Sequence, residues 1–69
     1  QLFIEAKDGF TSIEKVEIYD AVGKRVQDVA FASFSPAVML DVQILPKGMY
    51  TVWIFVEGNQ AYQEKIVIE

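Results

Sequence analysis

Short runs in which hydrophobic and polar residues alternate occupy most of this chain. Because side chains of a strand point alternately to opposite faces, such runs predict strands that bury one face. The runs are rich in Val, Ile, Tyr, Phe and Thr, which favour strands, and no segment supports a long amphipathic helix. They cover residues 1–6, 15–19, 24–29, 38–45, 49–56 and 61–69.

The alternation assigns one set of side chains in each run to the core. The predicted inward residues are Leu2, Ile4, Val16, Ile18, Val26, Val38, Leu40, Val42, Tyr50, Val52, Ile54, Val56, Ile66 and Ile68. Residues 30–37 are the least patterned, and there we expect the rings of Phe31 and Phe34 to cap the core. Pro36 excludes a central strand in this segment, because proline cannot donate a hydrogen bond to a sheet.

Turn-forming residues separate the runs, at positions 8–9, 20–23, 46–48 and 57–60. Six to seven short strands joined by turns about every 8–12 residues predict an all-β fold, an antiparallel β-sandwich. A chain of 69 residues forms one domain, which we assign to residues 1–69. It contains neither cysteine nor histidine, which excludes disulfides and a structural zinc site. Stability must therefore come from a thin apolar core, or from support by a neighbouring domain.

The charge of the chain excludes several classes of partner. The formal net charge is −4 with no basic stripe, which argues against binding to nucleic acid. The longest apolar runs fall well short of the ~20 residues that span a membrane. The chain shows no signal-peptide pattern and begins in mid-pattern with Gln-Leu-Phe, so we expect it to be a piece of a longer protein.

Candidate chemistry is sparse. The hydroxyls of Ser12, Ser33 and Ser35 have no histidine to activate them, so we do not expect an enzyme. Asp8, Asp20 and Asp28 could bind calcium, but they lack the closely alternating carboxylates of a calcium loop, and turn chemistry explains them better.

The glycines and the paired aromatic residues complete the candidates. Gly48 and Gly58 lack the spacing of a phosphate loop, so no cofactor is expected. Trp53 and Phe55 alternate with the inward residues and should lie on the opposite face. There they are either covered by loops or exposed as a contact surface, and the alternation does not decide between these readings.

The last run, E-K-I-V-I-E, also has two interpretations. It could be a plain edge strand in which Lys65 opposes aggregation, or a strand that another sheet recognises by backbone pairing. The residues alone favour the plain strand.

Three motifs, taken in order, change this balance. They are V-E-I-Y-D-A-V-G-K-R-V (residues 16–26), L-D-V-Q-I-L-P-K-G-M-Y-T-V-W-I (residues 40–54) and E-K-I-V-I (residues 64–68). Together they resemble the C-terminal sorting domain of type IX secretion system cargo in Bacteroidetes, also called the Por secretion system tail. The family pattern is roughly V-x-I-Y-D-x-x-G-K-x-V, then I-D-L-x-x-L-x-x-G-x-Y-x-V-x-I, then K-I-V-I near the end.

The resemblance implies a small Ig-like sandwich that serves as an address label for a secreted passenger. An outer-membrane translocon would recognise the folded domain after its passage into the periplasm. A surface sortase would commonly remove it and attach the passenger to anionic lipopolysaccharide, leaving the passenger at the cell surface or secreted. The residues that the resemblance carries over as a binding site are Gly48, Tyr50, Gly58, Lys65, Ile66, Val67 and Ile68.

We therefore expect a non-catalytic sorting domain that presents the hairpin of residues 49–56 and 61–69 to the export machinery. The alternative is an adhesive or structural Ig-like module of a surface protein, which would bind through Trp53 and Phe55. An exposed long edge would also allow self-association by strand exchange between copies. A fragment of a catalytic domain is the poorest interpretation, because no nucleophile and base can be paired.

Overall fold

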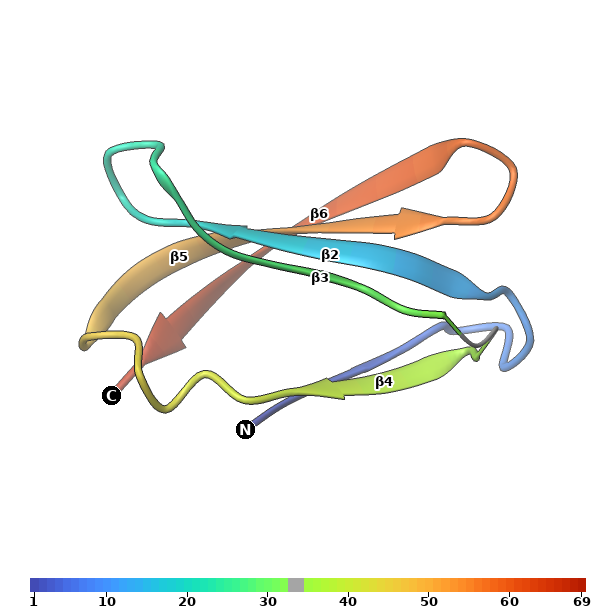
Figure 1. The fold of residues 1–69 in the computed structure, drawn as a ribbon, viewed down its shortest axis with the longest axis horizontal. Coiled ribbons are helices and arrows are strands. Elements are labelled where there is room, and N and C mark those ends of the chain that lie inside the picture. The colour runs from blue at the N-terminus through green and yellow to red at the C-terminus, as the bar shows by residue number, and fades with distance from the viewer. Residues whose placement is uncertain (33–34) are drawn as a thin grey trace.

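Two antiparallel sheets stacked face to face make up the fold, shown in a computed structural model that describes residues 1–32 and 35–69 (Figure 1). The strands are β1 (Leu2–Glu5), β2 (Ile13–Tyr19), β3 (Arg25–Ala30), β4 (Ala37–Leu40), β5 (Gly48–Val56) and β6 (Gln60–Ile68). One sheet has the order β3-β2-β5-β6, and the other consists of β1 and β4. The prediction of an all-β sandwich is confirmed, and the architecture is consistent with a small Ig-like domain. The described residues include no helix long and apolar enough to cross a membrane.

The predicted inward faces meet between the two sheets. Val16 and Ile18 of β2 are fully buried, and Ile13 and Val52 are each only 1 % exposed. The remaining buried apolar residues are Val38, Leu40, Val42, Leu45, Tyr50 and Val56. Half-buried apolar side chains pack around them, and those from the predicted inward set are Leu2, Ile4, Val26, Ile54, Ile66 and Ile68. Each residue predicted to face inward therefore contributes to the core or to its border.

Ile13 is a core residue that the alternation does not predict. It is odd-numbered, whereas its buried neighbours Val16 and Ile18 are even-numbered. The pairing of β2 with β5 is irregular between Ile13 and Lys15, where the register shifts. Such a bulge inserts one extra residue and so returns the side chain before it to the inner face.

The strand predicted over residues 38–45 is too long, because β4 ends at Leu40. Its partner β1 begins at Leu2, which pairs with Leu40, so in the described part of the chain no strand pairs with the residues that follow. The backbone N–H of Gln43 donates to the Asp41 carboxylate at 3.0 Å, and Leu45 N–H donates to the Val42 carbonyl at 3.1 Å. This segment is a turn, although its apolar side chains still reach the core.

Of the two phenylalanine rings expected to cap the core in the segment between β3 and β4, one can be compared with the structure. Phe31 is half-buried and packs against the core, as expected. Phe34 lies outside the described residues. Pro36 stands just before β4, and its carbonyl accepts a hydrogen bond from the Ala6 N–H at 2.7 Å.

Two of the carboxylates considered as calcium ligands stabilise turns instead. Asp20 accepts hydrogen bonds from the backbone N–H groups of Val22 at 3.1 Å and Lys24 at 2.9 Å. The turn closes through Gly23, whose φ of 89° favours glycine. Asp8 accepts from two backbone N–H groups and from the Thr11 hydroxyl in the same way. Turn chemistry therefore explains both residues.

Candidate functional site

The last strand, β6, lies at an edge of the four-stranded sheet. It pairs with β5 along its whole length, from Gly48 opposite Ile68 to Val56 opposite Gln60. In the sheet order it has a neighbour on one side only, so among the described residues its other side carries no strand. The run E-K-I-V-I-E therefore forms the end of an edge strand.

The position of β6 relative to the second sheet divides it into two halves. Figure 1 shows β6 running obliquely, with its hairpin end far from the β1–β4 layer and its C-terminal end close to it. Residues 60–65 are exposed, whereas Ile66 and Ile68 are half-buried and pack against the core. The C-terminal half thus anchors the strand, and the N-terminal half projects beyond the smaller sheet.

Within residues 65–68, the predicted binding residues point to two faces. Ile66 lies opposite Tyr50 on the inner face, and Ile68 follows it on the same face. Lys65 and Val67 lie on the outer face, where Val67 is 62 % exposed. Of the four residues, two therefore hold the strand in place and two are available to a partner.

Tyr50 and Gly48 fix the start of the hairpin. The Tyr50 ring is buried, and its hydroxyl donates a hydrogen bond to the Pro46 carbonyl at 2.5 Å. This is the type of contact that forms the tyrosine corner of Ig-like sandwiches, in which a tyrosine bonds the backbone a few residues upstream. Gly48 has a φ of 153°, which L side chains rarely adopt. Both residues therefore shape the hairpin, and their recognition by a partner stays a prediction.

At the opposite end of the hairpin, Gly58 and Asn59 form the tip. Their φ angles are 83° and 59°, both in the left-handed region. Gly58 is exposed, and a side chain added there would meet nothing within 4 Å. Its conformation explains the glycine, and the open space around it leaves room for contact with another molecule.

Trp53 and Phe55 lie on the outer face of the four-stranded sheet, opposite the core, as the alternation predicts. Both are half-buried rather than freely exposed. The Lys15 ammonium lies 4.8 Å from the centroid of the Phe55 ring, within the range of a cation–π contact. A side chain from the neighbouring strand, rather than a loop, thus covers part of this aromatic pair.

The same face contains a buried carboxylate, which was not among the candidate residues of the sequence analysis. Glu17 is only 8 % exposed. Its carboxylate accepts a hydrogen bond from the Tyr19 hydroxyl at 2.8 Å and contacts the Lys15 ammonium at 3.2 Å and the Arg25 guanidinium at 3.5 Å. The Tyr19 hydrogen bond, followed by that from Lys15, lowers the pKa of Glu17. Its partners Lys15 and Tyr19 stand two residues away on the same face, which is the signal that the sequence contained.

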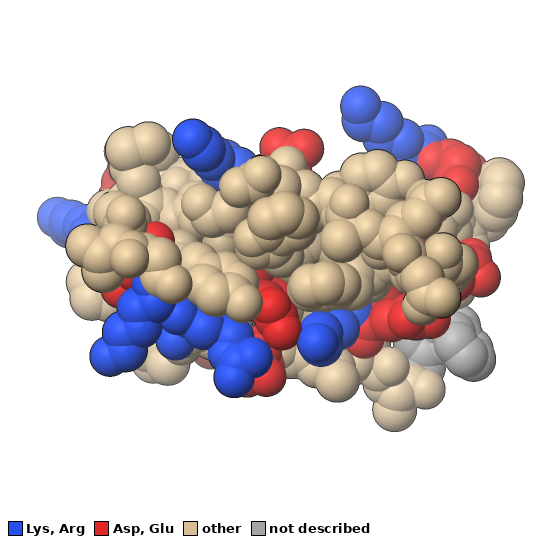
Figure 2. Space-filling view, turned by 90° about the horizontal axis from the view of Figure 1, so that it is seen from above, with Lys and Arg blue, Asp and Glu red and all other residues tan. Residues whose placement is uncertain are grey.

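Figure 2 looks onto this outer face. Uncharged side chains cover its middle, and Lys, Arg, Asp and Glu lie mainly around its margins. Trp53 and Phe55 are cross-strand neighbours of Glu17 and Lys15, so the aromatic pair and the carboxylate form one layer over the sheet. The contacts of this layer between Lys15 and Phe55 and around Glu17 are all made within the domain.

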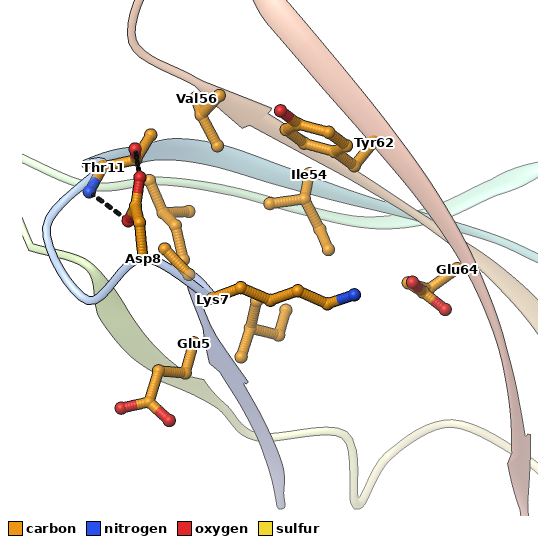
Figure 3. Close-up of a pocket in the computed structure, with 11 residues that line it drawn as sticks. Glu5, Lys7, Asp8, Thr11, Ile54, Val56, Tyr62 and Glu64 are labelled. Carbon is orange, nitrogen blue, oxygen red and sulfur yellow. Dashed lines mark hydrogen bonds between the residues drawn. The ribbon is translucent and has the colours of Figure 1, made fainter.

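A groove of about 360 Å³ lies between β1 and the β5–β6 hairpin (Figure 3). Ile4, Ile54 and Tyr62 are among the residues that line it, together with Lys7 and Glu64. In Figure 3 the Lys7 side chain extends across the groove with its ammonium toward Glu64. The groove exists because the second sheet has two strands and the first has four, so part of the inner face of β6 is left uncovered.

Asp8 stands at one end of this groove. The hydrogen bond from the Thr11 hydroxyl, with those from the Thr11 and Phe10 N–H groups, lowers the pKa of its carboxyl group. Its oxygens are thus engaged by the turn that they stabilise. Within residues 1–32 and 35–69, no three acidic side chains come close enough together to hold a metal ion.

A model of the family described as the secretion system C-terminal sorting domain matches residues 1–69, the whole chain. The chain belongs to this family. No curated protein and no solved structure matches it. The match confirms the resemblance seen in the three motifs. The sorting domain is therefore a type IX secretion signal, its partners are a passenger protein and the secretion system, and its destination is the cell surface or the extracellular space.

The three motifs of the sorting domain correspond to distinct parts of its fold. The first covers most of β2, the turn held by Asp20, and the start of β3. The second runs from the end of β4 through the Tyr50 corner into β5, and the third is the second half of β6. The first two motifs thus build the sandwich, and the third forms an edge of it.

Proposed function

We propose that the sorting domain acts by being recognised and catalyses no reaction itself. It presents the β5–β6 hairpin to an outer-membrane translocon, which binds the domain in its folded form. The observation that supports this most directly is the position of β6, an edge strand with its first six residues exposed. The absence of histidine and cysteine from the chain agrees with a role in recognition.

An edge strand suits such a role because its unpaired backbone can extend another sheet. Backbone hydrogen bonds then supply affinity, and alternate side chains supply specificity. In β6 the half-buried Ile66 and Ile68 keep the strand attached to its own core while the outer edge pairs. The domain can therefore bind a partner without unfolding.

The remaining steps of the proposed route rest on the family resemblance. The domain passes through the periplasm with its passenger and is recognised there. A surface sortase then removes it, and the passenger is attached to anionic lipopolysaccharide. Each step requires the domain to remain folded until the translocon has engaged it.

A secretion assay tests the recognition step. A reporter passenger fused to residues 1–69 should leave the periplasm, and removal of residues 65–69 should retain it there. Because that deletion also removes Ile66 and Ile68 from the border of the core, a second variant must spare the fold. Val67→Glu changes only an outward-facing side chain of β6 and should reduce export at least severalfold.

Val22→Glu is the matched control. Val22 is 87 % exposed in the turn between β2 and β3, far along the chain from β6, and receives the same substitution. It should be exported like the parent. Circular dichroism of both variants should show the parental fold. Equal export of the Val67 variant and the parent, together with unchanged export after the deletion, would refute recognition through β6.

A further inference from the structure

The charges on the free edge of β6 restrict which strand can pair with it. This inference deepens the proposed function, since it concerns the partner of the same edge. Between Gln60 and Ile68 the strand carries two charged residues, Glu64 and Lys65, which are adjacent and exposed. Because neighbouring residues of a strand point to opposite faces, Glu64 lies on the inner face and Lys65 on the outer face.

A second copy of the chain makes a poor partner for this edge. Two copies that pair antiparallel are related by a two-fold axis perpendicular to the sheet, so residues directly opposite each other lie on the same face. Glu64 can therefore never face Lys65 of another copy. The register that pairs the whole strand places Glu64 opposite Glu64, and a shift toward the C-terminal end places Lys65 opposite Lys65. Like charges directly opposite each other destabilise a sheet.

A strand of different sequence can satisfy both charges. We propose that β6 selects an antiparallel partner strand that presents a basic side chain to Glu64 on the inner face and an acidic side chain to Lys65 on the outer face. In such a strand, read from its N-terminus, the acidic residue immediately precedes the basic one. Apolar residues before this pair would lie opposite Ile66 and the exposed Val67.

The groove beneath β6 is consistent with this assignment. Glu64 and Tyr62 line it from the hairpin side, so a basic side chain opposite Glu64 would extend over its open edge. Lys7 extends toward Glu64 from the opposite wall (Figure 3). A carboxylate has two oxygens, so Glu64 can accept a hydrogen bond from a basic side chain of the partner strand although the Lys7 ammonium points toward it.

Two synthetic peptides provide the test. They have the sequences Thr-Val-Val-Glu-Lys-Thr-Val and Thr-Val-Val-Lys-Glu-Thr-Val and differ only in the order of the charges. Each is titrated at up to millimolar concentration into the ¹⁵N-labelled chain of residues 1–69, and the amide shifts of β6 report binding by NMR. Since each opposite-charge pair is replaced by a like-charge pair, the Glu-Lys peptide should bind at least about fivefold more tightly.

Charge reversal in the protein provides the decisive comparison. The E64K/K65E variant should prefer the Lys-Glu peptide by a similar factor. The E14K/K24E variant makes the same exchange at two exposed residues of β2 and the following turn, and it should keep the parental preference. No shift in β6, equal affinities, or a preference that E64K/K65E leaves unchanged would overturn the proposal. The peptide assay contains no secretion system. If the chain gives one of these results but still directs export, the charge preference of β6 is refuted and the proposed function stands.

Discussion

Replacing Tyr50 with phenylalanine isolates the contribution of one hydrogen bond to the hairpin. The substitution keeps the ring, which is 6 % exposed, and removes only the hydroxyl that donates to the Pro46 carbonyl. A neutral hydrogen bond within a protein contributes a net of about 0.5–1.5 kcal/mol. Pro46 is an exposed residue, so water can reach its carbonyl once the hydroxyl is gone. We therefore expect Tyr50→Phe to lower the free energy of unfolding by about 0.5–1 kcal/mol.

A loss of this size is measurable in a small domain. For a chain of this length, 1 kcal/mol corresponds to about 4–8 °C in melting temperature, so Tyr50→Phe should lower Tm by about 2–8 °C. Urea unfolding gives the free energy directly. Trp53 is the single tryptophan of the chain, half-buried in β5 near Tyr50, and its fluorescence can follow the transition.

Tyr62→Phe removes a hydroxyl of the same kind from an exposed position. That hydroxyl donates to the Gln60 side chain at 3.1 Å, with both residues exposed. Water replaces such a contact readily, so the expected change is below about 0.5 kcal/mol. Equal stability of the Tyr50 variant and the parent, or equal losses in the two variants, would refute the assignment of Tyr50 as the anchor of the hairpin.

Two further substitutions test the hairpin tip and the buried carboxylate. Gly58→Ala should lower the free energy of unfolding by about 1 kcal/mol in a thermal unfolding experiment, because the φ of 83° disfavours a side chain although nothing within 4 Å obstructs it. Asn59→Gly, at φ 59°, is the control and should cause no loss of stability. Unchanged stability of Gly58→Ala would contradict the argument. The lowered pKa of Glu17 means that its ionised form stabilises the fold above its unfolded pKa, and that this contribution is lost as pH falls through the folded value, below about pH 4.3. Glu17→Gln should therefore lose less stability than the parent when urea midpoints are compared from neutral pH down to about pH 3, and parallel losses would refute this role.

Local information in the sequence determined most of the strands and the faces that they bury. Alternation identified Val16, Ile18 and Val52 as core residues because the period of two is a property of the strand itself. Turn residues such as Asp20 and Gly23 act through hydrogen bonds and φ angles within a few positions, so they too are readable from a short stretch. The three motifs also identified the family, whose model covers the whole chain.

Only the tertiary structure decided which strands pair and which lie at an edge. The same alternation would suit several antiparallel orders, so the sequence could not place β6 beside β5 with its other side free. The end of β4 at Leu40 depends on the length of its partner β1, and the buried Glu17 lies beside Trp53 of the distant strand β5, its cross-strand neighbour. The groove below Tyr62 arises from the unequal number of strands in the two sheets. Each of these features depends on contacts between segments far apart in the chain, and a local pattern of residue types does not specify such contacts.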